Sequence, residues 1–218
     1  MTQAKRLIVF TRYPRPGKAK TRLIPALGAE GAAALQRQMT EYTLTQVKQL
    51  VADQSCSAEI WFAGTDAPEV DRQLMQDWLG TNWVYRPQSG GDLGKRMADA
   101  FAAAFADGIV RVVTIGTDCP QLDASRLSQA FAALETHDLV LGPATDGGYY
   151  LIGLRRSIPE LFTGIAWSTA EVLSATVQIA EHLGLSIAYL DRLTDIDRPE
   201  DLPVWQAIPR FSGSSLAP

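Results

Sequence analysis

The chain has 218 residues, of which 46% are apolar and 20% charged, with a formal net charge of −4. This composition is ordinary for a globular protein, and the acidic balance argues against nucleic-acid binding, which requires a basic face. The cysteines Cys56 and Cys119 match no zinc or disulfide motif, and no apolar run is long enough to predict a signal peptide or a membrane span, so we expect a cytoplasmic protein.

Apolar stretches rich in β-branched and aromatic residues predict strands at 6–11, 58–64, 83–87, 111–117, 138–144, 148–154 and 186–190. Amphipathic stretches between them predict helices at 29–52, 67–79, 93–106, 124–135 and 169–183, with a short last helix near 198. We expect one domain over 1–208 and a flexible tail at 209–218, where Ser, Gly and Pro are frequent.

Polar residues ahead of several helices have the spacing of N-terminal caps. The pairs with capping-box spacing are Asp66 with Glu69, Ser168 with Glu171, and Asp197 with Glu200. Asp123 is a further expected N-cap, and Gly184 is expected to end the helix that follows Ser168.

Strands that alternate with helices predict an α/β protein with a mostly parallel sheet covered by helices on both faces. Residues 145–148 are too few for a crossover helix, so the second half of the sheet should be mixed. Ligands bind at the carboxyl ends of strands in such sheets. The chemically distinctive segments 12–22, 88–94, 117–121 and 145–148 all follow predicted strands.

The first of these segments is basic and lies within FTRYPRPGKAKTRL (10–23). Its spacing does not match a Walker A loop, because Arg12 stands where the first glycine belongs and Ala19 follows Gly17-Lys18. Arg and Lys side chains there, including Arg12, Lys18, Lys20 and Arg22, suit a diphosphate or triphosphate. A merely solvated basic loop is the alternative.

The other segments each have a functional and a structural interpretation. Gly90 and Gly91, with Asp92, precede a helix and allow close approach of a nucleotide, or they form a flexible loop. Asp118 directly follows a buried strand and suits Mg²⁺ bound together with phosphate, or it caps a turn. Asp146, followed by Gly147 and Gly148, could contact a sugar or act as a base, or it is a turn residue.

Two further features are equally open. Asp195 and Asp197, two apart on an extended segment, could supply a second metal anchor. Trp167 could stack on an acceptor or belong to the core.

Five segments together resemble the small GT-A-like glycosyltransferases, also described as nucleotide-diphospho-sugar transferase-like or radical-SAM/selenodomain-associated transferases. The resemblance runs from about residue 6 to 205 and rests on KAKTRL (18–23), GGDLGKRM (90–97), GTDCPQL (116–122), GPATDGGYYLIGL (142–154) and DIDRPEDL (195–202). It implies a three-layer α/β/α, Rossmann-like GT-A fold. Some nucleotidyltransferases of the wider superfamily carry a similar basic loop.

The resemblance implies that Lys20 and Arg22 contact phosphate and that Asp118 binds metal. GT-A enzymes usually carry Asp-x-Asp at the metal, whereas this chain has Thr117-Asp118-Cys119, so a second ligand must come from elsewhere.

We therefore expect a glycosyltransferase that uses Mg²⁺ or Mn²⁺, a nucleotide-diphospho-sugar and a small acceptor. In this hypothesis Asp118 and Asp146 are the catalytic residues, and Gly147, Gly148 and Trp167 face the sugar or acceptor. The alternatives are a nucleotidyltransferase that joins an NTP to a phosphorylated small molecule, and a non-catalytic nucleotide- or anion-binding protein. Neither nucleic acid nor a membrane is an expected partner.

Overall fold

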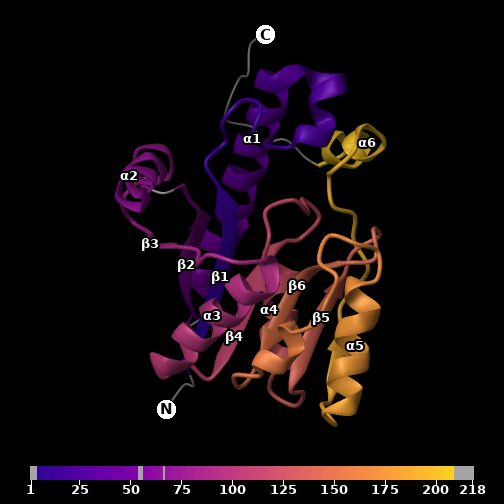
Figure 1. Ribbon diagram of the computed structural model, residues 1–218. Coiled ribbons are helices and arrows are strands. Elements are labelled where there is room, and N and C mark those ends of the chain that lie inside the picture. The colour runs from indigo at the N-terminus through magenta and orange to yellow at the C-terminus, as the bar shows by residue number, and fades with distance from the viewer. Residues whose placement is uncertain (1–3, 54–55, 66, 209–218) are drawn as a thin grey trace.

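A seven-stranded sheet forms the centre of the computed structural model, which describes residues 4–53, 56–65 and 67–208 (Figure 1). The strand order is β3-β2-β1-β4-β6-β5-β7. The expected tail at 209–218 lies outside the described residues. Each predicted strand is confirmed, and the bounds are β1 Lys5–Arg12, β2 Cys56–Ala63, β3 Val84–Pro87, β4 Arg111–Ile115, β5 Leu139–Pro143, β6 Tyr149–Leu154 and β7 Ile187–Tyr189.

The sheet is mostly parallel, with one antiparallel strand in its second half. β1 pairs in parallel with β2 and β4, and β5 pairs in parallel with β7. β6 is antiparallel to both of its neighbours, β4 and β5. The short connection between β5 and β6 therefore makes a hairpin, as its length predicted.

Helices cover both faces of the sheet, which gives the expected three layers. In chain order they are η1 Thr21–Leu23, α1 Ile24–Asp53, α2 Pro68–Leu79, α3 Leu93–Ala106, α4 Ala124–Ala133, η2 Pro159–Phe162, α5 Val172–His182, η3 Pro199–Asp201 and α6 Leu202–Gln206, where η marks a 3₁₀ helix. One core cluster joins the sheet to α1, α2 and α4 through side chains such as Val47, Met75 and Phe131. The other joins it to α3, η2 and α5 through Phe101, Phe162 and Ala180.

Helix α1 is broken at Gly28, whose φ of 70° and ψ of 168° are not helical. The regular part therefore begins where the sequence predicts it, at residue 29. The turn before the break, with Leu23, packs against Ile196 and Trp205 in a small third core cluster. Residues 196–206 are thereby held beside the start of α1, at the upper end of the molecule in Figure 1.

The capping predictions are confirmed in part. The Asp123 side chain accepts a hydrogen bond from the Arg126 amide at 2.8 Å, as predicted for an N-cap. Gly184, with a φ of 66°, ends the helix before it, also as predicted. The cap expected at Asp66 lies outside the described residues.

Two capping predictions are wrong. The sequence predicts a helix from residue 169 with Ser168 as its cap, but α5 begins three residues later, at Val172. Ser168 has a left-handed φ of 67° and therefore cannot start the helix. Asp197 does not cap the last helical segment. The Asp201 carboxylate instead accepts from the amides of Asp197 (3.0 Å) and Arg198 (2.8 Å).

Candidate functional site

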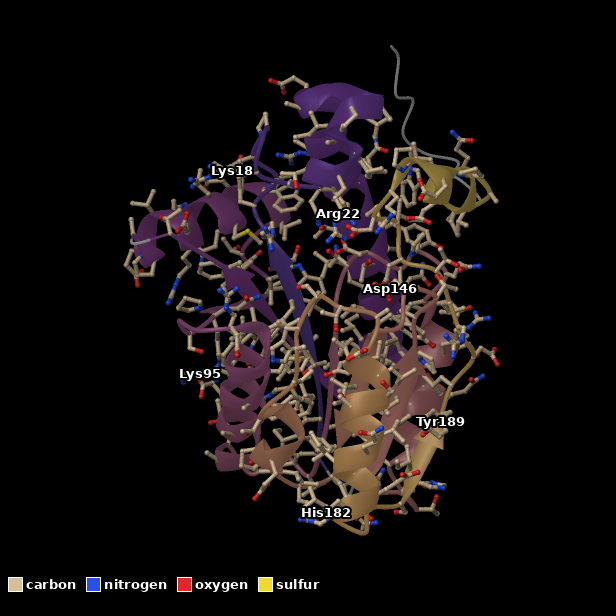
Figure 2. The ribbon with its side chains drawn as sticks, turned by 45° about the vertical axis from the view of Figure 1, so that its right-hand side comes forward. Lys18, Arg22, Lys95, Asp146, His182 and Tyr189 are labelled. Atoms are coloured by element: carbon tan, nitrogen blue, oxygen red, sulfur yellow. The ribbon has the colours of Figure 1, made fainter. Side chains whose placement is uncertain are left out.

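The loops that carry the unusual residues meet at one edge of the sheet. β1, β4, β5 and β7 all run in the same direction, so their carboxyl ends share that edge with the β5–β6 turn. Figure 2 shows Lys18, Arg22 and Asp146 toward this end of the molecule, and His182 at the other. The strand directions therefore place the predicted segments at the same edge of the sheet, as the sequence predicted.

Two adjoining cavities open at this edge. The larger has a volume of about 880 Å³ and the smaller about 320 Å³. They share five lining residues, Arg12, Leu93, Asp118, Tyr149 and Asp195. Most of the predicted site residues line the larger cavity, namely Arg12, Lys18, Lys20, Arg22, Asp118, Asp146, Gly148, Trp167, Asp195 and Asp197.

Lys20 is the most enclosed of the basic residues, with its side chain 3% exposed. Its Nζ lies 2.9 Å from Asp118 Oδ1 and 3.9 Å from Asp197 Oδ1, and it donates a hydrogen bond to the carbonyl oxygen of Ile196. The Lys20 backbone is left-handed, with a φ of 47°. The start of η1 therefore directs this ammonium inward, to the acidic residues after β4 and β7.

The other basic side chains of the loop have different partners. Arg22 is 58% exposed and forms an ion pair with Asp197. Arg15 forms an ion pair with Asp71, which is absent from the lining of both cavities. Arg12 lines both cavities, so it lies where a ligand bridging them would pass.

The acidic residues of the site lie close enough to influence one another. Burial, together with the negative charges of Asp118 and Asp146, raises the pKa of Asp195 to about 7, against the opposing effect of Lys20. Burial without a matching positive charge is costly for a carboxylate. The arrangement therefore favours a cation beside Asp118 and Asp195.

Asp118 and Asp195 fit Mg²⁺ or Mn²⁺ only as a partial ligand set. Asp118 Oδ1 is buried and, within the described part of the chain, has no hydrogen-bond partner, although Lys20 lies beside it. Among the residues described, no three His, Cys, Asp or Glu side chains are grouped so as to hold a metal. One or two carboxylates completed by phosphate oxygens and water is the usual set for Mg²⁺, and these residues fit it.

Asp146 and Gly147 form the tight turn between β5 and β6. Asp146 Oδ1 accepts a hydrogen bond from the Gly148 amide at 2.9 Å. Gly147 has a φ of 92°, its carbonyl accepts from the Leu173 amide at 2.9 Å, and a Cβ there would overlap the carbonyl oxygen of Ala170. The turn is therefore docked on the start of α5, with Asp146 in the lining of the larger cavity.

The glycine segment before α3 lies differently from the expectation. Gly90, Gly91 and Asp92 do not appear in the lining of either cavity. The Asp92 carboxylate caps α3 by accepting from the Lys95 amide at 2.8 Å. The Gly91 carbonyl accepts from Arg96 Nε at 3.1 Å, so this segment positions Arg96, which lines the smaller cavity.

Trp167 both packs and lines the larger cavity. A Cβ on Gly94 would lie 2.6 Å from the Trp167 ring and 2.5 Å from the carbonyl oxygen of Phe162. Gly94 thus allows the ring to approach the first turn of α3. The two interpretations of Trp167 are compatible in this arrangement.

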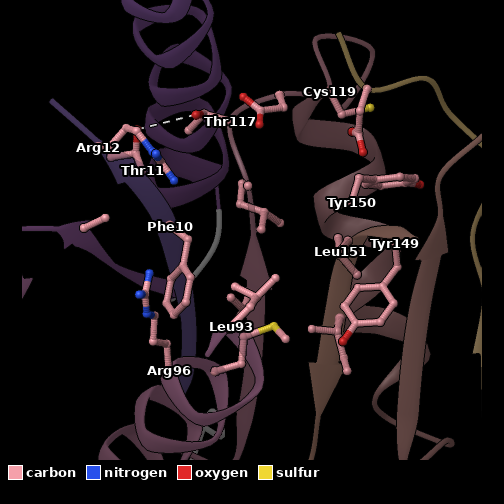
Figure 3. Close-up of a pocket in the computed structure, with 18 of the residues that line it drawn as sticks. Phe10, Thr11, Arg12, Leu93, Arg96, Thr117, Cys119, Tyr149, Tyr150 and Leu151 are labelled. Atoms are coloured by element: carbon pink, nitrogen blue, oxygen red, sulfur yellow. Dashed lines mark hydrogen bonds between the residues drawn. The ribbon is translucent and has the colours of Figure 1, made fainter. Parts of the chain in front are cut away.

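The smaller cavity involves residues that the sequence did not single out. Figure 3 shows Phe10 and Arg12 of β1 on one side and Tyr149 of β6 on the other. A register shift at Gly142 and Pro143 pairs Pro143 with Tyr149. Thr114 Oγ1 in the lining is buried and has no hydrogen-bond partner within the described residues. A β-strand threonine carries no sequence signal that distinguishes it from a core residue.

A buried polar network lies beneath Arg12 and Asp118. The Thr11, Thr40 and Thr117 hydroxyls lie 3.2 to 3.4 Å from one another, and Gln36 Nε2 donates to those of Thr40 and Thr117 at 3.2 and 3.1 Å. Figure 3 shows the contact between Thr11 and Thr117 as a dashed line. Thr40 and Gln36 belong to α1, and the other two end β1 and follow β4. The network ties these strand ends to one helix.

Comparison with known proteins identifies the family. The sequence pattern of the family described as "Uncharacterized protein conserved in bacteria (DUF2064)" matches residues 46–169. No curated protein matches the sequence. A crystal structure from Desulfovibrio desulfuricans G20, described as a "putative nucleotide-diphospho-sugar transferase", is 33% identical with a TM-score of 0.84, over 98% of this chain and 90% of that one.

More distant structures share the fold. Glucosyl-3-phosphoglycerate synthase from Mycobacterium tuberculosis, in complex with Mn²⁺, UDP and glucosyl-3-phosphoglycerate, is 14% identical with a TM-score of 0.56, over 93% of this chain and 75% of that one. The 4-diphosphocytidyl-2C-methyl-D-erythritol synthase of Anaerococcus prevotii DSM 20548 is 11% identical with a TM-score of 0.58, over 93% and 95%. No helix among the described residues has the length and apolar character needed to cross a membrane. The chain belongs to the DUF2064 family and to the small GT-A-like transferases, and it has their Rossmann-like nucleotide-diphospho-sugar transferase fold.

Proposed function

We propose that this protein transfers a sugar from a nucleotide-diphospho-sugar to a small acceptor with the help of Mg²⁺ or Mn²⁺. The observation that carries the proposal is the larger cavity, where basic side chains from the loop after β1 face the carboxylates that follow β4 and β7. Basic groups beside carboxylates suit a metal-bound diphosphate, because its oxygens can bind both. The 33% identical relative described as a nucleotide-diphospho-sugar transferase supports the same reaction class.

The two cavities suggest how such a substrate would lie. The smaller cavity has an apolar floor with a few polar groups, among them Arg96, Thr114 and Gln88, which suits a base and ribose. Arg12 lines both cavities, so the diphosphate would pass beside it toward Lys18 and Arg22. The sugar and the acceptor would then occupy the larger cavity between Asp146 and Trp167.

The roles of the side chains follow from these positions. Asp118 and Asp195 would hold the metal, which when bound stabilises negative charge on the departing diphosphate. Arg12, Lys18 and Arg22 would add positive charge at the same oxygens, an electrostatic stabilisation of the leaving group. Asp146 would orient an acceptor hydroxyl or take its proton.

Nucleotidyl transfer is the second candidate. The larger cavity has five basic side chains in its lining, which is enough charge for a triphosphate: Arg12, Lys18, Lys20, Arg22 and Arg198. A nucleotidyltransferase would release pyrophosphate from an NTP, whereas a glycosyltransferase would release a nucleoside diphosphate from a sugar nucleotide. Product analysis after incubation with each substrate class distinguishes the two.

The first test is a binding screen of sugar nucleotides, nucleoside diphosphates and triphosphates, with and without Mn²⁺, read as a thermal shift. A ligand at 100 times its Kd adds about 2.7 kcal/mol of stability. We expect Asp118→Asn to abolish the Mn²⁺-dependent part of the shift, because it removes one metal-binding charge. Asp77→Asn, on α2 and outside the lining of both cavities, is the matched control. Metal-dependent binding that survived in Asp118→Asn would contradict the assignment.

A further inference from the structure

The ammonium group of Lys20 lies against the carboxylate where a metal would bind. It contacts Asp118 Oδ1 at 2.9 Å and also donates to the Ile196 carbonyl, with the side chain 3% exposed. An ammonium so enclosed needs its oxygen partners, since burial of an unpaired charge is unfavourable. When no ligand is bound, the Lys20 ammonium is therefore the positive charge that balances the Asp118 carboxylate.

The backbone supports this placement. Lys20 is non-glycine and left-handed, with a φ of 47°, a conformation that costs free energy and persists only when its surroundings enforce it. The Leu23 amide donates to the Lys20 carbonyl at 2.8 Å, which continues the chain into η1. The Ile196 amide in turn donates to the Asp118 carbonyl at 2.8 Å. One backbone hydrogen bond thus holds the residue that carries the ammonium, and a second joins the two residues that accept from it.

Asp197 is occupied by the same loop. Its Oδ1 lies 3.9 Å from Lys20 Nζ, and it forms an ion pair with Arg22. Asp195 differs, because it forms no ion pair among the described residues and lines both cavities. Of the two aspartates proposed from the sequence as metal anchors, Asp195 is therefore available to a metal, and Asp197 anchors the basic loop.

We propose that Lys20 is a built-in counter-ion that keeps divalent metal off Asp118 until phosphate enters the site. The inference rests on the proposed function, since it assigns a gate to the same phosphate and metal site. An ammonium and a divalent ion at one carboxylate oxygen repel each other strongly. Phosphate oxygens offer the ammonium another partner, so phosphate and metal bind with positive cooperativity.

Equilibrium dialysis of Mn²⁺ against the protein tests this gate, with inorganic pyrophosphate as a phosphate probe that needs no particular base. The Mn²⁺–pyrophosphate complex passes through the dialysis membrane, so only metal bound to the protein is retained on the protein side. We expect the wild-type protein to bind Mn²⁺ weakly alone and at least tenfold more tightly with saturating pyrophosphate. Lys20→Met should bind Mn²⁺ alone at least tenfold more tightly than wild type, with a smaller pyrophosphate effect.

Lys48→Met is the matched control, because Lys48 is an exposed lysine of α1 that lines neither cavity. It should leave the affinity for Mn²⁺ alone unchanged. Unchanged or weaker Mn²⁺ binding in a folded Lys20→Met protein would overturn the inference. Tight wild-type binding of Mn²⁺ that pyrophosphate does not improve would overturn it without any variant.

These outcomes separate the gate from the proposed function. A protein that retained no pyrophosphate under any condition would contradict the phosphate site itself. The affinities of wild type and Lys20→Met for Mn²⁺ without pyrophosphate would still decide whether Lys20 excludes metal. If Lys20→Met did not fold, Lys20→Gln would serve in the same comparison, with the same expected and contradicting results.

Discussion

Arg15 Nη2 lies 2.9 Å from Asp71 Oδ1, an ion pair that joins the basic loop after β1 to helix α2. Asp71 also accepts hydrogen bonds from the Thr65 amide and from the Thr65 hydroxyl at 2.8 Å. Arg15 is therefore a structural member of this loop, whereas Lys20 and Arg22 turn toward the cavity. The loop is held at both ends, by α2 and by residues 196–197.

Asp71→Asn should destabilise the protein by about 2 kcal/mol, because it removes the charge from a buried, hydrogen-bonded carboxylate. Urea unfolding at pH 7 measures the change. Asp77 on the same helix accepts a side-chain hydrogen bond from Gln73 at its surface, and Asp77→Asn should change stability by less than about 0.5 kcal/mol. If Asp77→Asn lowered the free energy of unfolding as much as Asp71→Asn does, the stabilising role of the ion pair would be contradicted.

The same residue predicts a pH dependence. Burial raises the pKa of Asp71, but the Thr65 hydrogen bonds and the Arg15 charge outweigh burial, so its pKa is lowered overall. A lowered folded-state pKa stabilises the protein fully above the unfolded value of about 3.9, and this contribution is lost as the pH falls through the folded value. The stability difference between wild type and Asp71→Asn should therefore shrink below about pH 4. A difference that grew on acidification would have the wrong sign.

Thr40→Val should weaken both folding and ligand binding. The Thr40 side chain is fully buried and contacts the hydroxyls of Thr11 and Thr117, which adjoin Arg12 and Asp118. Loss of one hydroxyl leaves buried partners unsatisfied, at a cost of about 1 to 3 kcal/mol. Thermal unfolding and pyrophosphate titration measure the two effects. Thr45→Val is the control, because the half-buried Thr45 hydroxyl donates to the Glu41 carbonyl of the same helix, and we expect it to change neither stability nor binding.

Gly147→Ala should disrupt the Asp146 turn. The left-handed φ of 92° and the overlap of a Cβ with the Ala170 carbonyl both oppose a side chain there. Gly108→Ala is the matched control, since Gly108 has a similar φ of 79° but a Cβ there would meet nothing within 4 Å. We expect both to lose about 1 kcal/mol of stability from backbone strain. Gly147→Ala should lose more than this, because its Cβ overlaps Ala170, and only Gly147→Ala should lose transferase activity. Equal activity of the two variants would show that the turn does not position Asp146.

Thr114→Val should separate stability from binding. Thr114 Oγ1 is buried without a hydrogen-bond partner in the described part of the chain, so an apolar side chain of the same shape should raise stability slightly, by up to about 1 kcal/mol. If Oγ1 serves the ligand, nucleotide affinity should fall by about tenfold, the cost of one lost hydrogen bond. Calorimetric titration, with pyrophosphate as the reference ligand, measures this. Undiminished nucleotide affinity would exclude Thr114 from recognition.

Local pattern was enough to predict the strands, the regular helices and the mixed second half of the sheet. Hydrophobic periodicity is a property of residues close together in the sequence, so it predicts strands and helices directly. The segment from Thr145 to Gly148 is too short for a crossover helix, so it predicts an antiparallel pair. The motifs likewise indicated Lys20, Arg22, Asp118 and Asp146, which all line the larger cavity. The predicted caps at Ser168 and Asp197 are wrong, because Ser168 has a left-handed backbone and the Asp197 carboxylate pairs with Arg22 instead of with a helix start.

The sequence by itself determined the composition of the site: which basic and acidic residues follow which strands. Only the tertiary structure decided their partners. Strand order brings the loop after β1 beside the segment after β4. The segment after β7, at the far edge of the sheet, returns over the strand ends, where Ile196 meets Asp118 and Leu23. As a result, Lys20 meets Asp118, Arg22 meets Asp197 and Arg15 meets Asp71. Such pairing depends on distance in space and on burial, and charges that lie far apart along the chain carry no local signal of it.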